Sequence, residues 1–132
     1  MLDSRGFFNT GAEEAEQVLA LCERSGWRIF RLPYGISSKE AFIAGVRSTL
    51  PLDPPLYGNK NWDALPDSLF SGLHATDEDR IAIVWPDGSQ LEARAPADFL
   101  VASDILADLP AQLADEIATV GETKQVLVLR VI

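Results

Sequence analysis

The chain has 132 residues, of which 47% are hydrophobic, and its 20 acidic against 11 basic residues give a net charge of −9. This length suits a single domain with one core. The acidic balance argues against nucleic acid or an anionic membrane as the direct partner, because both require clusters of Lys and Arg. A basic protein is the more natural partner, although an acidic chain can also simply be a soluble one.

The cysteine content and the start of the chain bear on the compartment. The single cysteine, Cys22, excludes an internal disulfide and a multi-cysteine metal site, and we expect it to be a small apolar core residue. No apolar run of signal-peptide length opens the sequence, and no segment approaches the roughly 20 apolar residues of a membrane span. We therefore expect a soluble cytoplasmic protein that is a monomer when free.

A helix followed by a strand is predicted at the start of the chain. Thr10 and Glu13 fit a capping box, and apolar or small residues then recur at helical spacing until Gly26. This pattern predicts a helix over about Ala12–Arg24. Residues 27–32 are rich in aromatic and branched side chains, which is typical of a strand.

A second helix and a proline-rich loop follow. Ser37 and Glu40 fit another capping box, which opens a helix that Pro51 closes. Residues 52–58 (LDPPLYG) cannot form regular secondary structure, because consecutive prolines lack amide donors and have a fixed φ.

Residues 57–69, YGNKNWDALPDSL, carry the main functional signal. Asn61 can cap a helix that begins at Trp62, and Asp63 and Asp67 then lie four positions apart on one face of it, roughly 6 Å apart at their Cβ atoms. Two like charges at this spacing repel each other, and a helix selected only for stability would more readily carry a Lys or Arg at one of them. The pair therefore favours a binding surface.

Pro66 complicates this helix, because it falls in the second turn, where its missing amide costs about one hydrogen bond. The first turn could be 3₁₀-like, or the regular helix could start nearer Leu65. The helix dipole offers a stabilising explanation for Asp63 in the first turn and a weaker one for Asp67 a turn later. Asp67 therefore carries most of the binding hypothesis.

The second half of the chain predicts two more strands. Residues 81–85 and 125–132 are nearly continuous apolar runs, typical of strands that are covered on both faces of a parallel sheet. Residues 96–120 show helical spacing, which Pro110 is expected to divide into two helices. Alternatively, residues 87–93 (DGSQLEA) could form a hairpin that returns from the strand at residues 81–85. The element order predicts an α/β fold with a small three-stranded parallel sheet and right-handed crossovers.

Other kinds of site find little support. His74 is the only histidine, with no second metal ligand at a diagnostic spacing and no GxSxG elbow in the chain. Glycine-rich phosphate loops are absent, and the acidic residues 77–79 indicate a solvated turn rather than a Ca²⁺ loop. Glycosidase carboxylates flank a cleft and usually come from separate elements, whereas Asp63 and Asp67 share one segment. We therefore predict no catalytic residue, metal or cofactor, and a carboxylate enzyme is the least favoured alternative.

Eight residues of the functional segment form a pattern close to YGxNxDALxDxL, with one additional residue before the asparagine: Tyr57, Gly58, Asn61, Asp63, Ala64, Leu65, Asp67 and Leu69. This pattern resembles the signature helix of the barstar family, which are intracellular inhibitors of small secreted bacterial ribonucleases. A tryptophan also closes the family's second strand, as Trp85 does here. The resemblance covers about residues 27–132 and implies a single barstar-like domain, with residues 27–132 as the core and residues 1–26 as an additional N-terminal helical extension.

The resemblance implies an inhibitor of a basic secreted ribonuclease. Carboxylates on a helix can occupy the positions of RNA phosphates among the Arg, Lys and His side chains of such an enzyme, and the net negative charge would steer the encounter. The best-known family member has an aromatic residue at the position of Pro66. Immunity against a different toxin is the alternative. The residues that the resemblance places at the partner surface are Asp63, Asp67, Tyr57, Gly58, Asn61 and Pro66.

Overall fold

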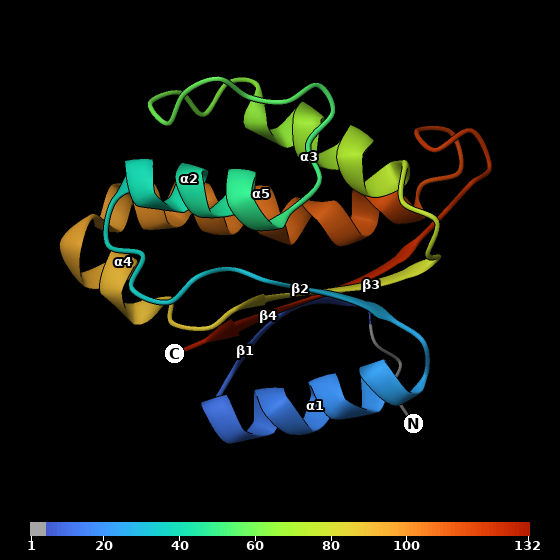
Figure 1. Ribbon diagram of the computed structural model, residues 1–132, viewed down its shortest axis with the longest axis horizontal. Helices are drawn as coiled ribbons and strands as arrows, with labels where there is room; N and C mark the ends of the chain where they lie inside the picture. Colours follow the sequence, from blue (N-terminus) through green and yellow to red (C-terminus); the bar gives the residue numbers. More distant parts are fainter. Residues whose placement is uncertain (1–4) are drawn as a thin grey trace.

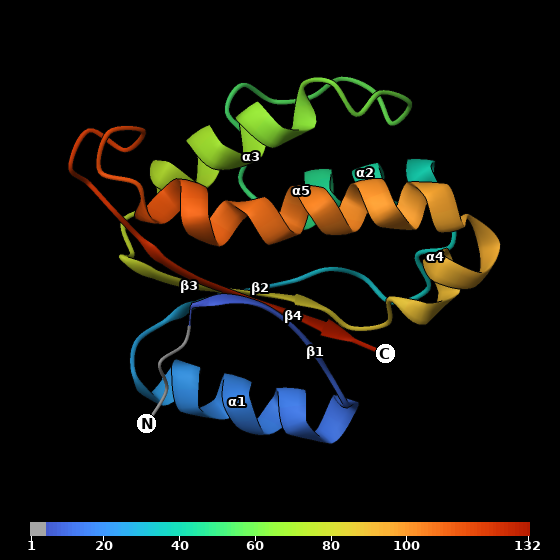
Figure 2. The ribbon, with the colours of Figure 1, turned by 180° about the vertical axis from the view of Figure 1, so that it is seen from behind.

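Four parallel strands form one sheet in the order β1-β4-β3-β2 in the computed structural model, which describes residues 5–132 (Figure 1). The strands are β1 (Gly6–Thr10), β2 (Arg28–Arg31), β3 (Arg80–Trp85) and β4 (Gln125–Val131). The helices are α1 (Ala12–Arg24), α2 (Lys39–Thr49), α3 (Leu65–His74), α4 (Ser89–Arg94) and α5 (Pro96–Ala114). Helices α2, α3 and α5 cover one face of the sheet and α1 covers the other, as the view from behind also shows (Figure 2).

The prediction of three strands was wrong, because β1 adds a fourth. This strand lies within the segment expected to be only helical, and its outer position leaves Phe8 48% exposed. Its sequence, GFFNT, carries no clear alternation. It is defined by its pairing with β4, where Gly6 lies opposite Leu127 and Thr10 opposite Val131. A pairing of such distant segments leaves no local sequence signal.

The three predicted strands all occur, and their parallel pairing confirms the α/β class. The N-cap residues of α1 and α2 differ from those predicted. Thr10 ends β1, and Gly11 occupies the N-cap of α1 without a side-chain hydrogen bond, so the first capping box was wrong. In α2 the cap is Ser38 rather than Ser37, and its Oγ accepts a hydrogen bond from the Ala41 amide at 3.1 Å.

Two further expectations were wrong after β3. Residues 89–94 form α4 and not a hairpin strand, since Asp87 Oδ1 accepts hydrogen bonds from the amide and hydroxyl of Ser89, and Leu91 is buried. Pro110 does not divide the following helix: α5 continues through it to Ala114. Leu109 and Leu113 on either side of Pro110 are buried in the core, and this packing offsets the lost backbone hydrogen bond.

A row of aromatic rings crosses the core between the sheet and its three covering helices. Ring centroids lie 5.8 Å apart for Trp62 and Phe42, 5.1 Å for Phe42 and Trp85, and 5.7 Å for Trp85 and Phe99. These are separations at which tilted aromatic pairs attract each other. The row runs from the segment before α3 through α2 and β3 to α5, and thus ties the candidate site to the sheet.

A second core lies between the sheet and α1. Cys22 is fully buried there, which confirms its expected place in the core, and burial raises the pKa of its thiol, although the nearby charge of Arg80 partly opposes this. The other buried members of this core are Ala15, Leu19, Trp27, Ala82, Val84, Leu127, Leu129 and Val131. Within residues 5–132, no helix is long and apolar enough to cross a membrane.

Candidate functional site

The segment that carries the functional signal forms a long loop that leads into α3. Regular helix begins at Leu65, so the start at Trp62 was wrong and the alternative near Leu65 is confirmed. Pro66 then occupies the first turn of α3, where an amide would have no helical partner and its absence costs nothing. The Leu65 amide donates to the carbonyl oxygen of Trp62 at 3.1 Å, a 3₁₀-type turn that precedes the helix.

Asp63 and Asp67 consequently sit in different local structures. Asp63 lies in the turn before α3, where its amide donates to Asn61 Oδ1 at 3.0 Å, whereas Asp67 lies in the first turn of the helix. Asn61 therefore caps a turn and not the helix. The dipole of α3 therefore stabilises the carboxylate of Asp67, whereas Asp63 lies outside the helix. The sequence predicted the opposite, with Asp63 in the first turn and Asp67 one turn later.

Both carboxylates are exposed. Within the described part of the chain, neither forms a salt bridge or a side-chain hydrogen bond, whereas Glu16, for comparison, pairs with Arg31. A pair of acidic side chains without an intramolecular counter-charge is available to an external cation.

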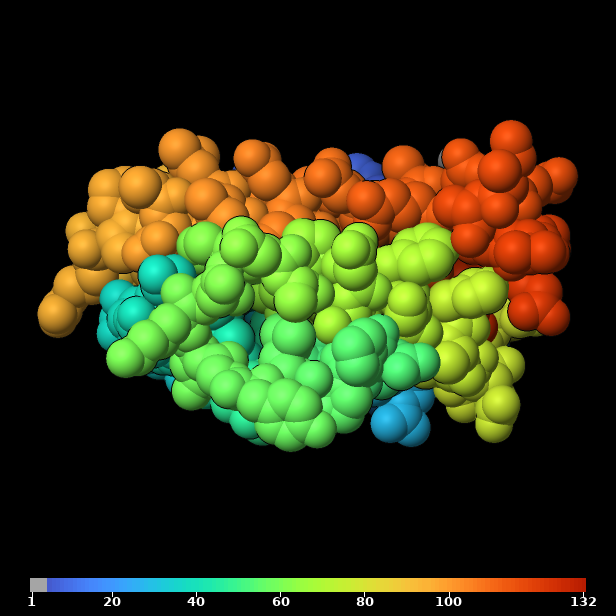
Figure 3. Space-filling model, turned by 90° about the horizontal axis from the view of Figure 1, so that it is seen from above, coloured from blue at the N-terminus to red at the C-terminus, as the bar shows by residue number. Residues whose placement is uncertain are grey.

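The loop before α3 presents a large aromatic side chain to solvent. Tyr57 is 92% exposed. Gly58 has no atom within 4 Å of the position that a Cβ would take, and its φ lies outside the left-handed region, so the fold itself does not require glycine there. Figure 3 shows this loop along one side of α3, with α5 along the other side.

Sequence reasoning missed a contact between α2 and this loop. Arg47 Nη1 donates a hydrogen bond to Asn59 Oδ1 at 2.6 Å. The two residues are separated by the proline-rich turn of the chain, and no motif links them. Only the folded loop brings them together.

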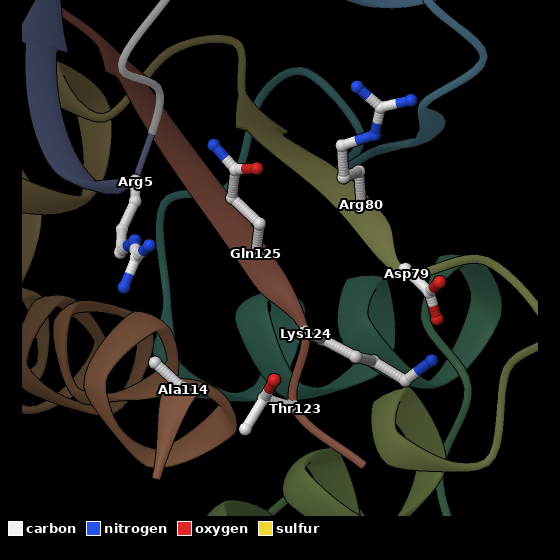
Figure 4. Close-up of a pocket in the computed structure, with 7 residues that line it drawn as sticks. All are labelled: Arg5, Asp79, Arg80, Ala114, Thr123, Lys124 and Gln125. Atoms are coloured by element: carbon white, nitrogen blue, oxygen red, sulfur yellow. The ribbon is translucent and has the colours of Figure 1, made fainter.

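The acidic residues 77–79 belong to a different end of the molecule, beside a cavity of about 270 Å³ at the amino-terminal ends of the strands (Figure 4). Lys124 is 7% exposed, and its Nζ donates to the carbonyl oxygens of Thr76 at 2.8 Å and Glu78 at 2.6 Å. The turn thus receives a buried ammonium, a role that the sequence did not reveal. In Figure 4 the guanidinium groups of Arg5 and Arg80 point in opposite directions and do not form a common anion site.

His74 has a structural role. Its Nε2 lies 3.1 Å from the carbonyl oxygen of Thr119, and its ring stacks on Phe70 with centroids 5.8 Å apart. These contacts connect the end of α3 to the segment before β4. Among residues 5–132, no group of three or more His, Cys, Asp or Glu side chains is arranged to hold a metal ion.

A protein-family model described as Barstar (barnase inhibitor) matches residues 29–127. The chain belongs to the barstar family. The match includes the whole loop, α3 and the first three residues of β4, whereas β1 and α1 precede it. Comparisons with curated proteins and with solved structures gave no match.

Membership of the barstar family indicates a ribonuclease inhibitor of the barnase-inhibitor kind or a related immunity protein. Proteins of this family are inhibitors and not enzymes, and their partners are ribonuclease-type proteins. The residues matched by the family model contain Asp63, Asp67, Tyr57, Gly58, Asn61 and Pro66.

Proposed function

We propose that this protein inhibits a basic bacterial ribonuclease by covering its active site with the start of α3 and the loop at residues 56–60. The observation that carries this proposal is the exposed, unpaired state of Asp63 and Asp67 in a barstar-family chain. Carboxylates in this state can accept charge-assisted hydrogen bonds from the Arg, Lys and His side chains that otherwise bind the RNA phosphate. Inhibition is then occlusion without a chemical step.

The loop residues support the same surface. Tyr57 is 92% exposed, and aromatic side chains are enriched at the centres of protein interfaces. The absence of a side chain at Gly58 lets a partner approach the backbone beside Tyr57. The two residues thus offer one large anchor next to one close contact.

Immunity against a different toxin is the second candidate, and two local features favour it. Pro66 removes the flat aromatic contact that the best-known family member has at this position, and the loop has one residue more than the family pattern between Gly58 and Asn61. Both changes alter the contact surface. Affinity capture with the purified protein, followed by identification of the bound protein, distinguishes a ribonuclease from another toxin.

A carboxylate enzyme is less favoured by the geometry. The three described cavities are lined by residues from other parts of the fold, and neither Asp63 nor Asp67 contributes to them. Both carboxylates are instead exposed to solvent.

The Asp67→Ala variant tests the proposed anchor. We expect it to weaken inhibition of the cognate basic ribonuclease about 10- to 150-fold, because a hydrogen bond to a charged group contributes about 1.5–3 kcal/mol. Inhibition is measured by titrating the protein against cleavage of an RNA substrate. The matched control is Glu14→Ala, which removes the same charge from the first turn of α1 on the opposite face of the sheet. If both variants inhibit as well as the parent, Asp67 is not the anchor.

A further inference from the structure

We propose that Arg47 is a positioning residue for the partner surface: its hydrogen bond to Asn59 holds residues 56–61 in the conformation that the partner meets. The inference rests on the proposed function, because it assigns a role within the same surface. It concerns a side chain of α2 that the family pattern does not include.

The loop is attached firmly at its beginning. The Asp53 amide donates to the carbonyl oxygen of Ser68 at 3.1 Å, and the backbone of Pro51 lies directly against Gly72 of α3. Leu56 packs against the main core. These contacts fix the entry to the loop but not the residues that follow Leu56.

The distal part of the loop has one attachment. Within the described part of the chain, residues 54–60 form a single hydrogen bond, the one between Arg47 Nη1 and Asn59 Oδ1 at 2.6 Å. Tyr57, Gly58 and Lys60 are exposed around it. Without this bond, the stretch between Leu56 and the Asn61 turn has no polar contact with the rest of the fold.

The position of Asn59 also explains how the loop accommodates its length. Asn59 is one of the two residues between Gly58 and Asn61, where the family pattern has one. The additional residue lengthens the loop, and the bond to α2 holds the longer loop against the body of the protein. A loop that is ordered before binding loses less entropy on association.

The change in partner binding on removal of Arg47 has opposite signs for a positioning role and for a purely electrostatic one. Arg47 is exposed and bonds to a neutral amide oxygen, so it orders the loop without neutralising Asp63 or Asp67. As a charge alone, its guanidinium opposes a basic partner, and its removal would strengthen binding. As a positioning residue, its removal weakens binding. The two roles therefore predict opposite changes.

The experiment compares Arg47→Ala, Asn59→Ala and the double variant in the intact protein. We expect each single variant to bind the ribonuclease about 3- to 10-fold more weakly, in the range of one hydrogen bond, and the double variant to be no weaker than either, because both changes remove the same bond. In the free protein, the backbone NMR order parameters of residues 57–60 should fall while those of β3 stay unchanged. Arg24→Ala is the control, since it removes the same charge from α1 on the opposite face of the sheet.

Three results would overturn the inference: tighter binding of Arg47→Ala, additive losses in the double variant, or unchanged backbone order parameters of the loop. A parent protein that binds no ribonuclease would overturn the proposed function instead. In that case the order parameters of the free protein still support or refute the ordering of the loop by Arg47, so the two failures are distinguishable.

Discussion

Gly72 allows the proline-rich loop to lie directly on α3. A Cβ at this position would be 2.1 Å from the carbonyl oxygen of Pro51 and 2.4 Å from its carbonyl carbon. Backbone atoms cannot rotate away as a flexible side chain does. The absence of a side chain at Gly72 therefore fixes where the loop that leads to Asp63 and Asp67 begins.

Gly72→Ala is expected to lower the free energy of unfolding by about 1–3 kcal/mol, because the new methyl group forces the backbone of the loop away from α3. The clash outweighs the roughly 1 kcal/mol by which alanine is the better helix former. Urea denaturation measures the change. Gly58→Ala serves as the control and should shift stability by no more than about 0.5 kcal/mol, since its Cβ would meet no atom. Equal stability of the two variants would contradict the close approach.

The individual site residues show what a sequence can predict at this scale. Asp63 and Asp67 were predicted as site residues from residue type and spacing, and Tyr57 from the family resemblance; the structure places all three at exposed positions. The local roles of Asp63 and Asp67 could not be assigned from the sequence. Pro66 moves the helix start by three residues, so that Asp67 and not Asp63 lies in the first turn of α3. Arg47 was missed because its partner becomes a neighbour only in the folded loop.

Arg130 of β4 connects elements that are distant in the chain. Its guanidinium lies 5.0 Å from the ring centroid of Phe7 in β1 and 4.4 Å from that of Phe99 in α5. It also donates to Asn9 Oδ1 at 2.8 Å and to the hydroxyl of Ser103. Burial lowers the pKa of Arg130, while the charge of Glu92 opposes this, and the group extends the row of aromatic rings from α5 to β1.

Arg130→Ala is expected to destabilise the protein by about 2 kcal/mol or more, because it removes hydrogen bonds from a charged donor together with two cation–π contacts. Amide exchange should accelerate in β1 before it does in β3. Arg28→Ala is the matched control: this arginine also stacks on an aromatic ring, that of Phe30, but it lies on the edge strand β2 and is exposed. If the two variants lose the same stability, Arg130 does not hold β1 to the core.

At the level of elements, the sequence predicts what is encoded locally. The apolar runs of β3 and β4 and the helical spacing of α1 are properties of contiguous residues, and the structure has these elements where the patterns place them. The edge strand β1 exists only by pairing with β4, and α5 continues through Pro110 because its neighbours pack in the core. Both outcomes depend on contacts with residues far away in the chain, and the hydrophobic periodicity of one segment contains no information about such contacts.

The charge of the whole molecule leads to a kinetic prediction. A net charge of −9 attracts a basic ribonuclease over distances larger than a hydrogen bond, and salt screens this attraction over roughly 10 Å at 0.1 M. We expect the association rate constant to fall at least tenfold between about 20 mM and 500 mM salt, whereas the dissociation rate constant changes much less. Stopped-flow mixing at several salt concentrations measures both. An association rate that does not depend on salt would contradict electrostatic steering.

The pairing of β1 with β4 sets an order of events during synthesis. β1 is the first of the four strands to be made, and its only neighbour in the sheet, β4, is the last. Asn9 and Arg130, which bond across this pair, are 121 residues apart. At roughly 5–20 residues per second, β1 waits about 6 to 24 s for its partner. During that time Phe7 and Phe8 remain outside the sheet, at a stage when an unpaired strand can associate with other chains.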